Sequence, residues 1–396
     1  MVFQTEKNIQ NYLLGKKESV LSAVIIIIAI IIRFIGRDFE SGDMHRFLIP
    51  WFIEIKQAGG ISSLSEQVGD YGLLYQTLIA IMTSTPLKAI YLYKLLSVSF
   101  DFLLACAVYR IMRDGYSVGS KHIISPAIVG GGGILLLPTT IINSAFWGQC
   151  DSMYTFFCLA TLYYLSKDRF TLAFIFYGLA IACKLQSVFI LPFILFYYLK
   201  RQNFTLLYFL ITIIVIWLTG TVAFIEGRSL FAPIEIYHNQ TFEYQSMYLN
   251  FPSFWVIAGN DYVSLKVFSV LTTGIICLFG GYAYLTDIRF DNRNGFYEIA
   301  TWFVWTMVLF LPSMHERYAY MLDVMLAMIS FYDKRHIKFA VIAVCTSLFL
   351  YGNYLFERER DVPLLWLSVI YLSAYLMFSY NLFFRKRKAG TSIQSC

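Results

Sequence analysis

Residues 19–36 read SVLSAVIIIIAIIIRFIG, an almost unbroken apolar run that decides the class of the protein. A helix needs about 20 apolar residues to cross a bilayer, where no water is available to satisfy the backbone. Lys16 and Lys17 precede the run as they would in a signal peptide. The run is too long for a signal peptide, however, and no small-x-small cleavage site follows. We therefore expect a retained membrane anchor.

The composition of the whole chain agrees with this assignment. Hydrophobic residues make up 58% of the 396 residues and charged residues 14%, against about 45–50% and 25% in soluble domains. These values exclude a soluble globular enzyme, a disordered chain and a disulfide scaffold. Further apolar segments lie at 89–111, 122–141, 152–166, 170–183, 186–199, 204–225, 264–286, 297–311, 318–332, 337–355 and 362–384. The sequence predicts an all-α polytopic membrane protein with about 12 transmembrane segments, within a range of 10–13.

Charge predicts how these segments are oriented. With both termini in the cytoplasm, the segments placed inside carry about twice as many lysines and arginines as those placed outside. This bias requires 71–86 to be a juxtamembrane or re-entrant part of the first external loop, 37–88; a full span there would invert the later loops. We divide the chain into a module 1–225 and a C-terminal module 226–396, which has external loops 226–263 and 312–318. The net charge of +6 is too small and too dispersed for a nucleic-acid surface.

Two stretches predict local features of the bundle. Basic ends bracket only 30 residues at 170–199, half the length that two crossings need. We expect a short, broken helix pair whose turn at 183–186 faces a cavity open to the outer face, because irregular backbone at that depth must lie inside protein or a wet cavity. The four glycines 130–133 lack the Lys-Ser/Thr of a phosphate-binding loop, and they favour close helix packing instead.

Polar residues of the predicted external loops gather at one membrane face. Asp43 lies just beyond the first span, ahead of a segment that resembles a helix lying in the membrane interface. The apolar residues of that segment are Phe47, Leu48, Trp51, Phe52 and Ile55, with Glu54 and Lys56 between them. Asp43 is either a catalytic carboxylate, which takes a proton from an attacking hydroxyl, or an ordinary loop residue or helix N-cap.

The remaining candidates lie in three later connections. His315, Glu316 and Arg317 form either a phosphate clamp or a charged cap between two helices. Lys184 is either an anion-binding group or the partner of Asp151 or Glu226 in an ion pair. Candidates for a sugar pocket are Trp147, Gln149 and Asp151, although an interfacial tryptophan is common at this depth. Zinc, Walker and nucleophile motifs are absent from the sequence.

These residues carry a resemblance to a known family. The motifs are GDMHRFLIPWFIEIKQAGG (42–60), DYGLLYQ (70–76), AFWGQCDSMY (145–154), CKLQSVFILP (183–192) and LPSMHERY (311–318). In this order they resemble bacterial integral-membrane relatives of GPI mannosyltransferase II, which belong to the GT-C superfamily of glycosyltransferases. The resemblance implies a GT-C-like helical bundle and transfer of a hexose, mannose in the eukaryotic members, from a polyprenyl-phosphate-sugar to a glycan or glycolipid acceptor. The transfer is expected at the extracytoplasmic face with inversion.

Site roles follow from the same resemblance. The acid of the first external loop, the proposed base, corresponds to Asp43. We expect the donor phosphate to bind Lys184, His315 and Arg317. We expect the sugar or acceptor to contact Asp70, Tyr71, Trp147, Gln149, Asp151, Gln186, Glu316 and Tyr318. A metal is expected not to be required, with a divalent ion as the alternative.

Two other functions stay open at this point. A transporter or flippase for lipid-linked sugars also needs many spans and buried charges, but the sequence has no internal repeat and its polar residues lie on one side. An O-antigen ligase or polymerase-type enzyme would use a lipid pyrophosphate donor. The expected partners are the donor lipid, the acceptor and membrane lipids, with no nucleic acid. The expected location is the bacterial cytoplasmic membrane, or the endoplasmic reticulum in a eukaryote.

Overall fold

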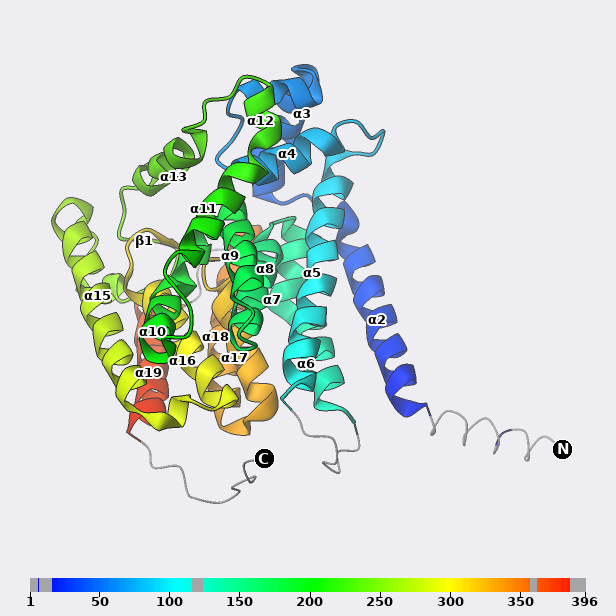
Figure 1. Cartoon of the computed structure of the whole chain (residues 1–396). Coiled ribbons are helices and arrows are strands. Elements are labelled where there is room, and N and C mark those ends of the chain that lie inside the picture. The colour runs from blue at the N-terminus through cyan, green and yellow to red at the C-terminus, as the bar shows by residue number, and fades with distance from the viewer. Residues whose placement is uncertain (1–5, 7–15, 116–123, 357–361, 385–396) are drawn as a thin grey trace.

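The computed structural model describes residue 6 and residues 16–115, 124–356 and 362–384, and these are almost entirely helical. Figure 1 shows long helices running between two ends of a bundle, with short helices α3, α4 and α12 at one end. Outside the helices, the described residues contain one two-stranded sheet, in which β1 (Tyr248–Leu249) pairs in parallel with β2 (Met314–His315). The predicted all-α class is confirmed for this part of the chain.

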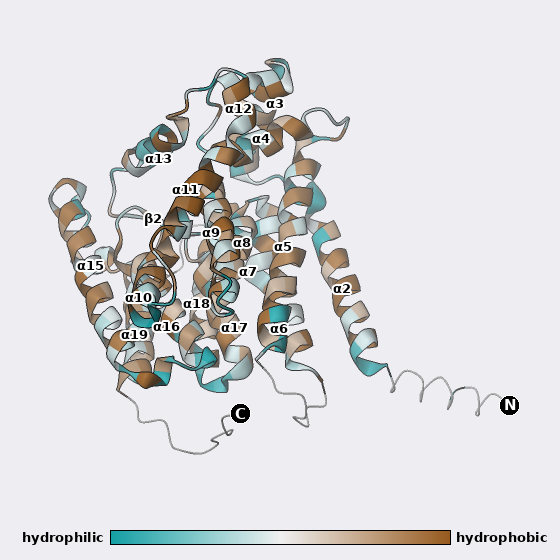
Figure 2. Cartoon of the chain, viewed as in Figure 1, coloured by the Kyte–Doolittle hydropathy of each residue, from teal (hydrophilic) through white to brown (hydrophobic). Residues whose placement is uncertain are grey.

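Five helical segments are long and apolar enough to cross a membrane. They are α2 (Lys17–Ile35) with its extension η1 (Gly36–Asp38), α5 (Ala89–Arg113), α15 (Tyr262–Thr286), α18 (Ile337–Leu355) with η7 (Lys334–His336) before it, and α19 (Leu364–Phe383). Helices α2 and α15 expose apolar side chains along their length, and Figure 2 colours much of both helices as hydrophobic. The chain therefore has the features of a membrane protein.

A sixth crossing results if the bent pair 126–147 counts as one span. The predicted segment 122–141 consists of α6 (Pro126–Leu135) and α7 (Pro138–Ile141), which continues into the π-helical turn η4 (Ile142–Trp147). Pro138 has no N–H to donate, so the helix breaks before it and the two halves meet at 42°. Residues 122 and 123 lie outside the described residues.

Shorter helices fill the rest of the bundle. They are α4 (Leu73–Met82), α8 (Asp151–Leu165), α9 (Phe170–Cys183), α10 (Leu191–Arg201), α11 (Tyr208–Thr219), α12 (Thr221–Ile225), α13 (Ala232–Glu243), α14 (Trp255–Ala258), α16 (Arg293–Phe310) and α17 (Tyr320–Tyr332), with 3-10 turns η5 (Leu185–Ile190) and η6 (Ile288–Phe290). The short, broken pair predicted at 170–199 is confirmed, since α9 ends at Cys183 and Lys184 is extended. The predicted segment 204–225 is divided at Gly220.

The first external loop is helical, as predicted, but its apolar face is used differently. The loop contains η2 (Met44–Leu48), α3 (Ile49–Gln57) and η3 (Gly60–Ser65). Leu48, Phe52 and Ile55 are buried in the protein core. The expectation that this face lies in the membrane interface is therefore wrong for these three residues, because α3 packs against α4 and α5.

Close packing of α5 against α6 confirms the role expected for the glycine run. A Cβ atom added at Gly131 would lie 3.0 Å from the carbonyl oxygen of Ala105. The same region holds a buried ion pair between Arg33 of α2 and Asp101 of α5, at 2.8 Å. Lys94 of α5 donates to the carbonyl oxygen of Gly36 at 2.7 Å. These contacts hold the chain where it leaves α2 and enters the first external loop.

One continuous core cluster extends through both predicted modules, from Met44 to Phe383. The division at 225/226 stays a prediction.

Candidate functional site

The carboxylate of Asp43 is the centre of a network that joins four distant parts of the chain. Its Oδ2 accepts hydrogen bonds from Trp147 Nε1 at 2.9 Å, Gln149 Nε2 at 2.8 Å and Arg317 Nη1 at 2.6 Å. The hydroxyl of Tyr354 donates to Oδ1. Asp43 is 6% exposed, so the solvated-loop alternative is wrong. It occupies the N-cap position before η2, but its side chain makes no capping hydrogen bond.

Local backbone geometry brings Trp147 and Gln149 to the same carboxylate. The π-helical turn η4 ends at Trp147, and Gly148 directly after it has a φ of +75°, a conformation that glycine adopts without strain. A Cβ atom at Gly148 would lie 2.5 Å from the methyl group of Met44. The hydroxyl of Ser41 donates to the Trp147 carbonyl oxygen at 3.1 Å and accepts from the backbone N–H of Met44. Ser41 therefore connects the loop that contains Asp43 to the turn that contains its donors Trp147 and Gln149.

Arg317 reaches Asp43 from a loop that is held by a distant segment. The parallel pair β1–β2 joins residues 248–249 to 314–315, and Ser313 Oγ donates to the carbonyl oxygens of Tyr244 and Ser246 at 3.0 Å each. Ser313 has a φ of +59°, which is strained for a residue with a Cβ. The guanidinium of Arg317 also lies 5.5 Å from the ring centroid of Trp147.

A second ion pair lies beside this network. Lys184 pairs with Asp151, so the ion-pair alternative for Lys184 is confirmed with Asp151 rather than Glu226 as its partner. The other carboxylate oxygen of Asp151 accepts from Asn143 Nδ2 at 2.8 Å. Lys184 Nζ lies 5.9 Å from the ring centroid of Tyr318. The hydroxyl of Tyr71 donates to Gln149 Oε1 at 3.0 Å, which links DYGLLYQ to the Asp43 network.

Electrostatics keep Asp43 ionised. Burial raises the pKa of its carboxyl group, but the charge of Arg317 and the hydrogen bonds from Tyr354, Arg317 and Trp147 outweigh burial, so the net pKa is lowered. Asp70 behaves differently, because burial raises its pKa. A general base works best with a pKa near the working pH. Asp43 would therefore gain basicity if Arg317 moved to another anion.

The other predicted residues lie around the two ion pairs without joining them directly. His315 Nδ1 lies 3.8 Å from Glu316, and the His315 ring contacts Tyr244 and Tyr318. Among the described residues Glu316 forms no ion pair with Arg317, which pairs with Asp43 instead. The side-chain oxygen of Gln186 is buried and has no hydrogen-bond partner among the described residues. At Asp70 the backbone carbonyl oxygen, not the carboxylate, accepts from Gln240.

Sequence reasoning missed two residues of the site. Tyr354 lies in the last turn of α18, within a segment interpreted only as a membrane span, yet it binds Asp43. Its ring also stacks on Trp147 with centroids 5.0 Å apart. Asn143 lies four residues before Trp147 and orients Asp151. The polar sequence YGNY at 351–354, at the end of an apolar run, is the signal that could have identified Tyr354.

A group of possible metal ligands lies elsewhere in the described part of the chain. One carboxylate oxygen each of Glu298 and Asp333 and a ring nitrogen of His336 lie within 4.8 Å of one another. His336 already contacts Glu298 at 3.1 Å, and Asp333 already pairs with Arg335. The 13-residue helix α17, about 20 Å long at 1.5 Å per residue, separates this group from the HERY loop. It is therefore not part of the Asp43 site.

No family model matches the chain, and no curated protein matches it. The function is accordingly argued from the geometry. The arrangement combines a carboxylate, an arginine that is bound to it, and a nearby lysine–aspartate pair. Aromatic rings surround all three. These groups are suited to accepting a proton and to binding an anionic group within the same small region.

Proposed function

We propose that the chain is an integral-membrane glycosyltransferase of the GT-C type. In this proposal it moves a hexose from a polyprenyl-phosphate-sugar to a hydroxyl of a glycan or lipid-linked acceptor. The observation that carries the proposal is the contact of Asp43 with Trp147, Gln149 and Arg317, which unites three of the motifs behind the family resemblance.

The proposed reaction is a single displacement at the anomeric carbon. The acceptor oxygen forms a bond to that carbon while the bond from the carbon to the phosphate oxygen breaks. The electron pair leaves on the lipid phosphate, and the acceptor proton moves to Asp43. The phosphate is already a stable leaving group, so the protein has to neutralise its charge rather than protonate it. Arg317, Lys184 and His315 are the groups proposed for this, and the mechanism requires no metal.

The two ion pairs give the donor a way to activate the base. Arg317 is bound to Asp43, and Lys184 is bound to Asp151. A donor phosphate that attracts Arg317 removes the contact that does most to lower the pKa of Asp43. The carboxylate then becomes a stronger base when a donor is bound. In this scheme Gln149 and Trp147 keep Asp43 oriented while Arg317 changes partner.

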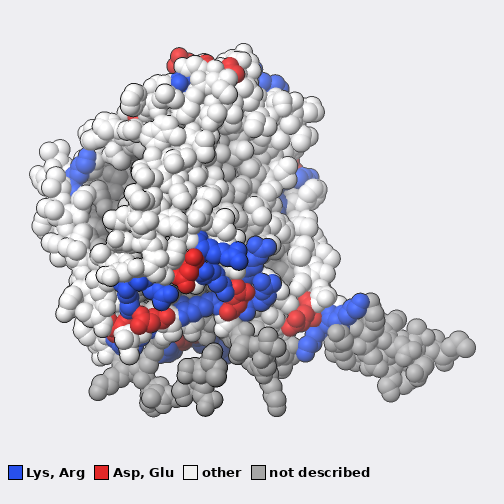
Figure 3. Space-filling model, viewed as in Figure 1, with Lys and Arg blue, Asp and Glu red and all other residues white. Residues whose placement is uncertain are grey.

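The finer topology also belongs to the proposal. We propose about 12 membrane segments, with both termini in the cytoplasm and the Asp43 site on the extracytoplasmic side of a bacterial cytoplasmic membrane. Five or six described helices are long and apolar enough to cross, and in this proposal shorter apolar helices such as α9, α11 and α17 contribute the other segments. Lys, Arg, Asp and Glu gather at the end of the bundle away from α3, as Figure 3 shows, and basic residues favour the cytoplasmic side.

The test is transfer by the purified full chain in nanodiscs. Polyprenyl-monophosphate hexoses and the matching pyrophosphates are supplied as donors, and labelled product is measured. Asp43→Asn is expected to lower turnover by at least about 100-fold, the lower bound for losing a general base. Asp38→Asn is the matched control, since Asp38 is an exposed acid of the same loop.

Three outcomes would contradict this proposal. A folded Asp43→Asn variant that kept most of its turnover would exclude Asp43 as the base. Transfer only from pyrophosphate donors would assign the enzyme to the ligase or polymerase type. Movement of an intact lipid-linked sugar across the membrane, with no transfer, would indicate a flippase.

A further inference from the structure

A second polar region lies at the opposite end of the bundle from α3, in the band of charged residues seen in Figure 3. A cavity of about 220 Å³ opens there between the α8–α9 turn, the end of α10, the end of α15 and the start of α16. The residues that define it for the present argument are Lys167, Tyr197, Arg201, Tyr284, Asp291 and Arg293. At about 30 Å³ per water molecule, the cavity has room for about seven waters. This space suffices for a phosphate group with part of its ester.

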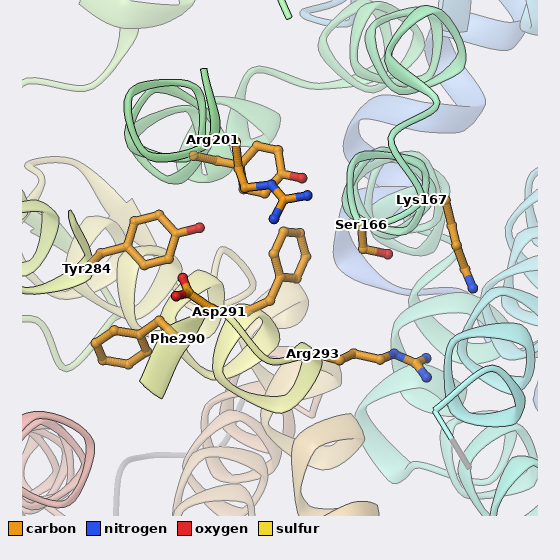
Figure 4. Close-up of a pocket in the computed structure, with 9 residues that line it drawn as sticks. Ser166, Lys167, Arg201, Tyr284, Phe290, Asp291 and Arg293 are labelled. Atoms are coloured by element: carbon orange, nitrogen blue, oxygen red, sulfur yellow. The ribbon is translucent and has the colours of Figure 1, made fainter. Parts of the chain in front are cut away.

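The charges that line the cavity are predominantly positive. It contains three cations, Lys167, Arg201 and Arg293, and one acid, Asp291. Figure 4 shows these groups on different walls, with Lys167 and Arg293 extending toward the same side. Each cation comes from a different element, so folding itself brings the positive charges together.

Neighbouring residues neutralise most of these charges, but not that of Arg293. Lys167 pairs with Asp114 at 2.9 Å, Arg201 pairs with Asp168 at 3.5 Å, and Asp291 pairs with Lys200 at 2.7 Å. Among the described residues no carboxylate pairs with Arg293. Its Nη1 atom is buried beside Gly115 and has no hydrogen-bond partner, so the other N–H groups of the guanidinium are those available to the cavity. An anion in the cavity would supply the opposite charge that Arg293 lacks.

The position of the cavity favours a phosphate carried by a lipid. Tyr284 lies in the last turn of α15, where that candidate membrane span ends, so the cavity lies at the level expected for lipid head groups. Phe290 and Phe296 add apolar walls on which the carbon part of an ester can pack. Basic pockets between membrane helices at such a boundary bind anionic head groups.

We propose that this cavity is a binding site for a phosphate ester, supplied by the head group of an anionic membrane lipid, and that Arg293 is its principal cation. The site does not depend on the proposed glycosyl transfer, because it involves none of the Asp43 network. A soluble phosphate ester shares the recognised chemistry, and the experiment distinguishes the two sources.

Binding is measured on the detergent-solubilised full chain by native mass spectrometry. The probes are phosphatidic acid, phosphatidylglycerol, zwitterionic phosphatidylcholine and soluble glycerol 3-phosphate. Both anionic lipids are expected to bind at least about fivefold more tightly than phosphatidylcholine, and Arg293→Gln is expected to remove about fivefold of that affinity. The matched control is Lys338→Gln, an exposed cation at the start of α18 that does not line the cavity.

A second variant keeps the proposal testable if Arg293→Gln does not fold. Asp291→Asn removes the acid of the cavity and releases Lys200, so anionic lipids are expected to bind about fivefold more tightly. Unchanged affinity in both variants, or equal losses in Arg293→Gln and Lys338→Gln, would overturn the proposed site. Glycerol 3-phosphate binding as tightly as phosphatidic acid would overturn the lipid as the source.

Discussion

The ion pair between Asp43 and Arg317 is expected to contribute more to the free energy of unfolding than the other contacts of either residue. A double-mutant cycle measures this contribution. The side chains are 8% and 19% exposed, so each charge depends on the other for compensation. Removing one partner of a buried pair costs about 3–5 kcal/mol, and partial exposure places both variants near the lower limit. We therefore expect Asp43→Asn and Arg317→Gln each to lose about 3 kcal/mol of unfolding free energy.

The double variant is expected to lose about 4 kcal/mol rather than the additive 6, because residues in contact are coupled by about 0.5–3 kcal/mol. The assay is thermal unfolding of the purified chain in detergent, followed by tryptophan fluorescence. The unfolding entropy per residue predicts roughly 1 °C for each kcal/mol in a chain of this length, so the single variants should lose roughly 3 °C. Asp38→Asn, whose side chain is 57% exposed, is the control and should lose less than about 1 °C. Additive losses in the double variant would refute the reasoning.

Three further predictions use the same unfolding assay. Because the pKa of Asp43 is lowered in the folded chain, its ionised carboxylate stabilises the fold above the carboxyl's unfolded pKa, and this stabilisation is lost as pH falls through the folded pKa. The wild type should therefore unfold at a higher temperature than Asp43→Asn at pH 5, and the difference should disappear only below about pH 4. Its disappearance at pH 6 would contradict this. Tyr354→Phe keeps the ring stacked on Trp147 but removes a hydrogen-bond donor from Asp43, so the pH at which the stabilisation by ionised Asp43 is lost should move upward. If that pH is unchanged, the hydroxyl does not act on the carboxylate. Gly131→Val should lose about 2 kcal/mol by separating α5 from α6, while Gly274→Ala, where an added Cβ atom meets nothing within 4 Å, should lose none; equal effects would refute the packing argument.

The parts of the fold that were predictable are those that depend on local sequence. The run 19–36 contains enough apolar length for a span, and Lys184 interrupts an apolar stretch too short for two crossings, so the anchor and the broken pair could both be recognised. The bend before Pro138 was missed because the run that leads up to it, 126–137, has no charged residue and was interpreted as part of one span. The burial of Phe52 and Ile55 was also missed, since an apolar helix face packs equally well on lipid or on other helices, and only the tertiary structure decides.

The candidate site was predictable in its members but not in its pairing. The five motifs identified Asp43, Gln149, Lys184 and Arg317 as residues that should lie together. Asp43 contacts Gln149 and Arg317 directly. Which cation binds which carboxylate depends on distances of a few ångströms between loops, and spacing along the chain contains no such information. Tyr354 was missed because a tyrosine within an apolar run resembles any other interfacial aromatic residue.

The short parallel pairing of 248–249 with 314–315 has a mechanical consequence. It couples the long connection after α12 to the segment that ends in Arg317, so a displacement of one is transmitted to the other. In the proposed glycosyl transfer, an acceptor that displaced the 226–263 connection would shift the Arg317 guanidinium without touching it. Binding of the acceptor would then change how Arg317 meets the donor phosphate.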